Sequence, residues 1–225
     1  MSFIDSPIEQ MTALTDAMLV ILAIASAIYI QRISHKDEWK AKLWVWVFSL
    51  LAIASLLGTI VHGLDMPQIL YHYLWYPLFV SLSMMIVLFV IATINDIWGE
   101  QTSRRILFIM LSIGAACSIV FIWKETFLVF IIYELVGMSF AFAGYLWLAY
   151  RGLLKGAGFM AAAVFVTIMA AGIQASQQRL FTSIFSLDHN GVFHLVQMVG
   201  VILFVLGLRK ALLYENDSSD NKKAE

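Results

Sequence analysis

The stretch LWVWVFSLLAIASLLGTIVHGL, residues 43–64, contains no Asp, Glu, Lys or Arg. A helix that crosses a membrane needs about 20 predominantly apolar residues, so this stretch by itself predicts one membrane span. Six further stretches of similar character follow the chain, namely 11–32, 75–92, 106–123, 127–150, 156–176 and 191–208. The sequence therefore predicts an all-α protein, a seven-transmembrane helix bundle.

The overall composition agrees with a membrane protein. Hydrophobic residues make up 61% of the chain and charged residues only 13%, whereas soluble domains are about one quarter charged. We expect one domain, residues 1–210, and a polar tail, residues 211–225, that stays disordered. The net charge of −1 gives no bulk attraction to nucleic acid. The expected partners are membrane lipids.

Lys and Arg residues predict the orientation of the bundle. With the N-terminus outside, the cytoplasmic side holds twelve of them and the outer side holds only Lys124 and Arg179. Cytoplasmic loops typically carry such an excess. We therefore expect the N-terminus outside, the C-terminus in the cytoplasm and, from the compact loops, a bacterial inner membrane. Residues 35–42 and Asp96 are expected to be solvated on the cytoplasmic side.

Polar residues within or beside the predicted spans gather near one end of the bundle. Ionisable residues in a membrane are costly and usually face the interior of a bundle. Alternation of the seven spans places the following residues in the non-cytoplasmic third: Asp16, His62, Asp65, Glu134, Gln174, His189 and His194. A shared polar site is therefore expected there.

Two of the predicted spans carry a stripe of polar residues at positions i, i+4 and i+7. The stripes consist of Ser55, Thr59 and His62 and of Asn190, His194 and Gln197. Residues at this spacing share one face of a helix. The stripes predict either a hydrogen-bond network that holds helices together or the lining of a binding site.

Histidines at one membrane depth point to a metal. The three residues are His62, His189 and His194. Neutral imidazoles are good zinc ligands, and three of them leave a position open for water. Zinc activates such a water and polarises a carbonyl group. Asp65 or Asp16 would serve as the acid/base or orient a ligand, and Thr59 would donate to a developing oxyanion.

The spacing of the last two histidines leaves two alternatives. His189 and His194 are five residues apart, which separates them by about 140° around a regular helix. Both reach one ion only if His189 lies in an irregular start of the helix, where Asp188 is a good N-cap candidate. Otherwise His189 caps the helix or faces water, and only His194 enters the site.

The pattern resembles the CREST superfamily of seven-span membrane proteins, which includes alkaline ceramidases and the progestin and adipoQ receptors. The resemblance lies in LGTIVHGL, residues 57–64, and in the His pair of DHNGVFHLVQ, residues 188–197. The segment TALTD, residues 12–16, is similar to an uncharacterised bacterial branch of such proteins. The resemblance implies zinc held by His62 and the His pair, and a hydrolase acting on a lipid or another amphipathic amide or ester.

Three departures separate this chain from the superfamily pattern. Gly58 stands where a Ser usually precedes the second-span His by four residues. Tyr73 stands where alkaline ceramidases have an Asp, and the final His pair is separated by four residues instead of three. Ceramide is therefore unsupported as the substrate. A sensor or receptor with a structural or ligand-binding His network is the alternative to a hydrolase. A small-molecule transporter is a third reading, against which the apolar inner halves of the spans argue.

Overall fold

The computed structural model describes residues 2–33, 37–124, 127–176 and 186–221, with the backbone alone at 127–128 and 214–221. Seven helices of this part of the chain are long and apolar enough to cross a membrane. This confirms the predicted all-α seven-helix bundle and makes the chain an integral membrane protein. The helices are α1 (Pro7–Ile33), α2 (Glu38–Gly63), α3 (Gln68–Trp98), α4 (Glu100–Lys124), α5 (Phe127–Arg151), α6 (Ala157–Ser176) and α8 (His189–Asn221). Arg179 lies outside the described residues.

Several helices extend beyond the apolar stretches that predicted them. α3 begins at Gln68 rather than at residue 75, and α4 begins at Glu100 rather than at residue 106. α8 continues to Asn221, so residues 211–221 of the predicted disordered tail are helical, while 222–225 lie outside the described part. Hydropathy marks only the membrane-embedded part of a helix, and a helix that is already nucleated adds residues at little cost.

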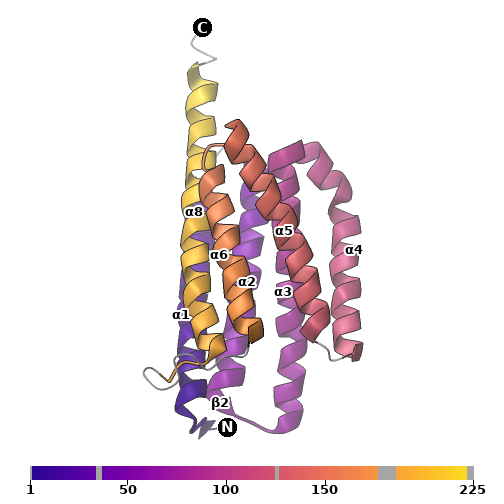
Figure 1. Cartoon of the computed structure of the whole chain (residues 1–225), viewed down its shortest axis with the longest axis vertical. Coiled ribbons are helices and arrows are strands. Elements are labelled where there is room, and N and C mark those ends of the chain that lie inside the picture. Colours follow the sequence, from indigo (N-terminus) through magenta and orange to yellow (C-terminus); the bar gives the residue numbers. More distant parts are fainter. Residues whose placement is uncertain (1, 34–36, 125–126, 177–185, 222–225) are drawn as a thin grey trace.

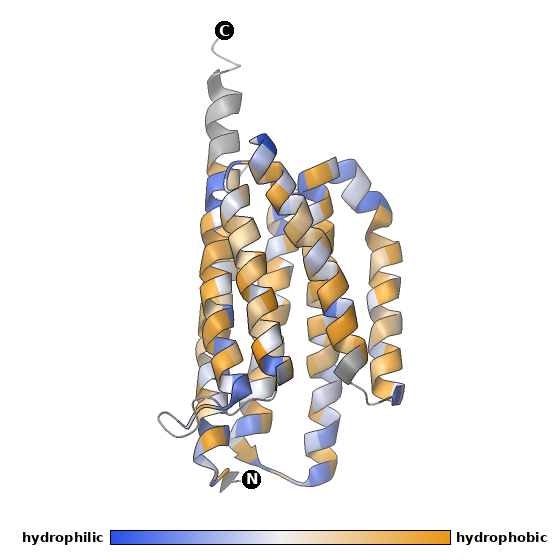
Figure 2. Cartoon of the chain, viewed as in Figure 1, coloured by the Kyte–Doolittle hydropathy of each residue, from blue (hydrophilic) through white to orange (hydrophobic). Residues whose placement is uncertain are grey.

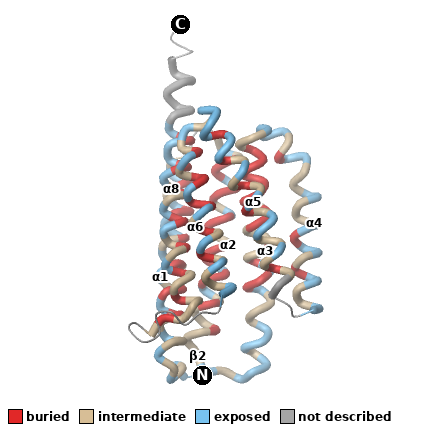
Figure 3. The backbone as a smooth tube through the Cα atoms, viewed as in Figure 1, coloured by how far each residue is buried: buried red, intermediate tan, exposed pale blue. Residues whose placement is uncertain are grey.

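Six of the helices form a ring, and α4 lies outside it (Figure 1). Neighbours around the ring are α1 and α2, α2 and α3, α3 and α5, α5 and α6, α6 and α8, and α8 and α1. α4 packs against α3 and α5. A Cβ atom on Gly114 of α4 would lie 2.6 Å from Cγ2 of Val87, so this glycine permits the close approach of α4 to α3. Buried residues occur along the ring helices, whereas α4 has few of them (Figure 3).

The two ends of the bundle differ. The described N-terminal and C-terminal segments lie at opposite ends, and polar residues flank an apolar middle (Figures 1 and 2). At the N-terminal end, β1 (Ser2–Phe3) pairs antiparallel with β2 (Leu64–Asp65), which directly follows α2. This short ladder, which hydropathy did not predict, attaches the start of the chain to the connection between α2 and α3.

At the opposite end, the predicted solvation of residues 35–42 and Asp96 is wrong for Lys40 and Ala41, which are buried, and for Asp96, whose side chain is buried, while residues 35–36 lie outside the described part. Lys40, in the first turn of α2, is only 3% exposed, and its Nζ atom lies 3.0 Å from Oδ1 of Asp96 in α3. The hydroxyl group of Tyr145 in α5 donates to Oδ2 of Asp96 at 3.0 Å. Buried charges require partners, and here the partners come from three helices. This buried ion pair therefore ties α2, α3 and α5 together.

Candidate functional site

An elongated cavity of about 480 Å³ lies inside the ring of six helices. Along α2 its lining runs from Trp44 to His62, a length of about 27 Å at 1.5 Å per residue. Ligand pockets in proteins commonly have volumes of about 300–1,000 Å³. The cavity therefore has room for a small molecule, including one with an extended chain.

Polar lining residues gather in the part of the cavity nearest the N-terminal end of the bundle, as their positions along their helices show. They are Asp16, Ser55, His62, Glu134, Thr167, Gln174, His189, Asn190, His194 and Gln197. The whole predicted stripe of α8 reaches the cavity. The stripe of α2 reaches it with Ser55 and His62 but without Thr59. The predicted shared polar region is thus present in the described residues.

The centre of this region is a contact between α1 and α8. Nε2 of His194 lies 3.3 Å from Oδ1 of Asp16, and the two residues are only 7% and 4% exposed. The other ring nitrogen of His194, Nδ1, lies 3.0 Å from Oγ1 of Thr15. The Thr15 hydroxyl donates its proton to the backbone oxygen of Thr12 at 2.9 Å. Because a hydroxyl has one proton, Thr15 accepts from Nδ1–H of His194 in the tautomer that keeps its bond to Thr12.

This tautomer has a consequence for the protonation of the Asp16–His194 pair. With a proton on Nδ1, Nε2 of a neutral imidazole is an acceptor, and it faces a carboxyl oxygen that also accepts. One proton must therefore lie between Nε2 and Oδ1, whichever atom carries it. The pair then has no net charge, which reduces the cost of burying it in a membrane. It also holds a proton that can move between a carboxyl and an imidazole group.

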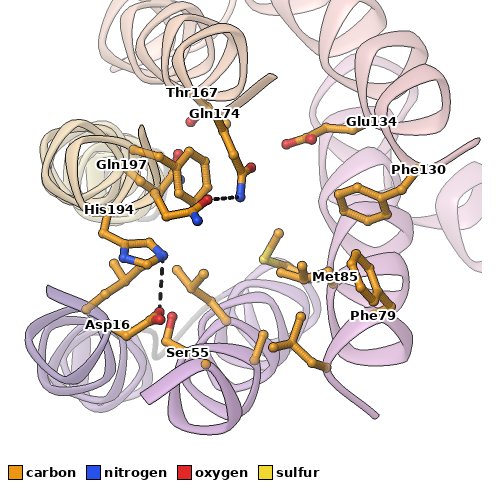
Figure 4. A pocket seen from close by; sticks show the side chains of 18 of the residues that line it. Asp16, Ser55, Phe79, Met85, Phe130, Glu134, Thr167, Gln174, His194 and Gln197 are labelled. Atoms are coloured by element: carbon orange, nitrogen blue, oxygen red, sulfur yellow. Dashed lines mark hydrogen bonds and ion pairs between the residues drawn. The ribbon is translucent and has the colours of Figure 1, made fainter. Parts of the chain in front are cut away.

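Gly58 of α2 leaves the space in which the Asp16 carboxyl group lies. A Cβ atom at Gly58 would lie 2.5 Å from Oδ2 and 2.9 Å from Cγ of Asp16. Ser55, one turn earlier on α2, points toward the same carboxyl group (Figure 4). Gly58 therefore keeps this space open, because a side chain there would displace the carboxyl group of α1.

Asp188 caps α8, as the sequence predicted. Its Oδ1 atom accepts from the backbone N–H of Gly191 and from the hydroxyl group of Thr12, both at 2.9 Å. Gln174 of α6 donates from Nε2 to Oδ1 of Asn190 at 3.3 Å. These bonds attach the first turn of α8 to α1 and α6 and so position its polar stripe.

The three predicted zinc ligands line one cavity but do not converge. Nδ1 of His62 lies 2.7 Å from Oε2 of Glu9 in α1. Nδ1 of His189 has no hydrogen-bond partner in the described residues, and it lies 3.9 Å from Oδ2 of Asp188. Both ring nitrogens of His194 are engaged as described above. No group of three or more His, Cys, Asp or Glu side chains within the described residues is arranged to hold a metal ion. This arrangement does not fit zinc, which stays a prediction from the sequence.

Two other predicted site residues lie away from the cavity. Thr59 donates its hydroxyl proton to the backbone oxygen of Ser55 at 2.8 Å, so that proton is not offered to an oxyanion. Asp65 is an exposed residue of β2, opposite Ser2 in the ladder. Neither residue lines the cavity. Of the two carboxylates predicted as the acid/base, the structure therefore places Asp16 at the cavity and Asp65 outside it.

Some buried polar atoms of the cavity wall have no hydrogen-bond partner among the described residues. They include Oγ1 of Thr167, Oε1 of Gln197 and Nε1 of Trp44. Buried polar groups in proteins are nearly always paired. These atoms are therefore exceptions, and each belongs to a residue that lines the cavity.

The end of the cavity far from Asp16 is apolar and bounded by aromatic rings. The ring centroid of Trp44 lies 5.6 Å from those of Phe48 and Phe89 and 5.2 Å from that of Phe204. Such distances are typical of packed aromatic pairs. We call these four side chains, from α2, α3 and α8, the aromatic floor. It lies between the polar region and the buried ion pair of α2 and α3.

Four residues that build the polar region were missed by sequence reasoning. They are Glu9, Thr12, Thr15 and Gly58. Thr12, Thr15 and Asp16 are spaced as neighbours on one helical face, and this spacing was an available signal. Glu9 and Gly58 gave none, because their roles depend on a side chain from another helix.

Comparison with known proteins found one match, which covers most of the chain. A family model described as a family of unknown function matches residues 11–213. No curated protein and no solved structure is significantly similar to the chain. The matched range contains the whole cavity lining.

Proposed function

Because the chain belongs to DUF6962, a family of unknown function, we propose a function from its site alone, the binding of an amphipathic small molecule inside the membrane. The protein would act as a sensor or receptor for that molecule. The observation that carries this proposal is one elongated cavity with a polar region at one end and the aromatic floor at the other.

The polar region suits the head of such a ligand. The Asp16–His194 pair places a carboxyl and an imidazole group at the cavity wall, and Gln197 and Thr167 have unpartnered atoms. A few convergent polar groups in an apolar pocket commonly fix the orientation of a ligand.

The apolar part of the cavity suits the body of the ligand. Between Asp16 and the aromatic floor the lining includes Leu51, Met85 and Val201. Each buried methylene group of a ligand contributes about 0.8 kcal/mol when it leaves water. The cavity lining includes neither Lys40 nor Asp96 at the opposite end, so binding fits the cavity better than passage through the bundle.

A hydrolase of a lipid-like amide or ester is the second candidate. The proton between Asp16 and His194, beside the hydroxyl-bearing Ser55, favours it, because such a pair can act in general acid–base catalysis. The resemblance to the CREST superfamily points the same way. Release of a fluorophore from a long-chain amide or ester by the purified protein, lost in His194→Ala, would support this candidate over the first. We also propose the bacterial inner membrane as the location.

A matched pair of variants tests the binding proposal. Met85 points into the cavity (Figure 4), whereas Met169 of α6 is 51% exposed on the outside of the bundle. Met85→Trp fills the cavity and Met169→Trp does not. We expect purified wild-type protein and Met169→Trp to bind dodecanol, and Met85→Trp to bind it at least tenfold more weakly. Equal binding by all three proteins would contradict the proposal.

A further inference from the structure

We propose that the ligand of this cavity carries a cationic amine at its polar end and that Glu134 of α5 pairs with it. The inference rests on the proposed binding function and narrows the chemical class of the ligand. Glu134 lines the cavity, and its carboxyl group points inward from the side opposite Asp16 (Figure 4).

The charges around the cavity leave Glu134 without a counterpart. Among the residues that the structure describes, the lining contains Asp16, Glu134 and three His residues, but no Lys or Arg. The carboxyl group of Asp16 is matched by His194, and His62 is matched by Glu9. Glu134 has neither a hydrogen bond nor an ion pair with any residue that the structure describes. Of the two carboxyl groups in the lining, it alone is unmatched.

An unmatched carboxylate within a membrane span is costly, and such groups commonly mark a ligand or ion pathway. An ammonium group on the ligand would supply the missing positive charge. Under the proposed function, the polar end of the ligand lies in the polar region of the cavity, where Glu134 is. A carboxylate or phosphate on the ligand would instead add repulsion, because like charges in a site of low polarity oppose each other.

Neighbouring side chains suit the same head group. An ammonium group has three donors in all, and the opposite wall includes the polar residues Gln197 and Thr167. Phe130 lies one turn before Glu134 on α5 and also lines the cavity. Its ring packs against Phe79 at a centroid distance of 5.5 Å. Aromatic faces stabilise nearby cations, and more so when water is excluded.

Three probes of equal chain length test the inference. Dodecylamine, dodecanol and dodecanoic acid differ only in the charge and hydrogen bonding of the head. Binding is measured with the full-length protein in nanodiscs of neutral lipid, so that a surface charge of the bilayer does not contribute. We expect the wild type to bind dodecylamine at least tenfold more tightly than dodecanol, and dodecanoic acid most weakly.

The variant Glu134→Gln keeps the size of the side chain and removes its charge. We expect it to lose the preference for the amine while dodecanol binding changes less than threefold. The control Glu100→Gln changes an exposed residue at the start of α4, paired on the surface with Arg104, and it should keep the preference. Thermal unfolding of each protein establishes that it is folded.

The possible failures are distinguishable. Binding of dodecanol and dodecylamine with equal affinity by the wild type would overturn the inference and leave the proposed function standing. A preference for dodecanoic acid, or an amine preference that persists in Glu134→Gln, would also overturn the inference alone. Absence of binding of all three probes would overturn the proposed function and the inference with it.

Discussion

Nε2 of His194 and Oδ1 of Asp16 lie 3.3 Å apart, across the contact of the first and last helices of the chain. In the tautomer in which Nδ1 of the same ring donates to Thr15, the two facing atoms share one proton. The residues are 178 positions apart in the sequence, yet their contact organises the polar region of the cavity.

Replacement of Asp16 tests this shared proton. In Asp16→Ala, Nε2 of His194 loses its partner in a buried place, and we expect the free energy of unfolding to fall by about 1–3 kcal/mol. In Asp16→Asn, the side-chain amide can donate to Nε2, so the loss should stay below about 1 kcal/mol. Unfolding in detergent measures both, with the exposed Asp5→Ala as control. Equal losses in the two Asp16 variants would show that the pair needs a negative charge.

Gly58 offers a second test of the same contact. Gly58→Ala would bring a methyl group to 2.5 Å from the Asp16 carboxyl group. We expect it to cost about 1–3 kcal/mol through overpacking and to weaken dodecanol binding. At Gly158 of α6 a Cβ atom meets nothing within 4 Å. Gly158→Ala should therefore leave binding unchanged and raise stability by about 0.5–1 kcal/mol. A neutral result at Gly58 would mean that the carboxyl group is not held there.

The buried ion pair at the opposite end should matter for stability. Lys40→Met leaves the Asp96 carboxylate buried without its charged partner, and we expect a loss of about 3–5 kcal/mol. The double variant Lys40→Met with Asp96→Leu removes both charges and should recover most of that loss. Lys42→Met, at an exposed surface pair, should change stability by less than about 0.5 kcal/mol. A double-variant cycle in detergent measures the coupling, and a value near zero would contradict a stabilising pair.

Metal analysis tests the predicted zinc site. Because Nδ1 of His62 pairs with Glu9 and both ring nitrogens of His194 are engaged, the described arrangement leaves no convergent set of three ligands. We expect purified protein to contain well below one zinc per chain and to keep its thermal stability in a chelator. One zinc per chain, lost in His194→Ala, would instead support the ligand set that the resemblance implies.

The fold could be predicted from the sequence because hydropathy is a local property. A stretch such as residues 43–64 crosses a membrane whatever its neighbours are, and the structure confirms all seven spans. The cap at Asp188 was predictable for the same reason, since its partner, the backbone N–H of Gly191, lies three residues away.

The candidate site could be predicted only in part. Alternation of spans placed Asp16, Glu134 and His194 near one end, and all three line the cavity. The depth of a residue in the membrane does not determine which residues of other helices it contacts. Those contacts depend on the rotation of each helix about its axis. The sequence therefore grouped His62 with His194, whereas in the structure His62 lies against Glu9 and His194 against Asp16. Lys40 and Asp96 were misplaced for the same reason, since their contact joins two helices.

The aromatic floor has a consequence for selectivity among molecules of one chemical type. If the polar end of a ligand rests at Asp16, the distance from there to Trp44 limits how far the rest of the molecule can extend. A shorter chain leaves part of the apolar wall uncovered, and each missing methylene group costs about 0.8 kcal/mol of binding. A longer chain meets the packed rings of Trp44, Phe89 and Phe204. The affinity of the bundle would then be highest for ligands of one chain length, and the four side chains of the aromatic floor would set that length.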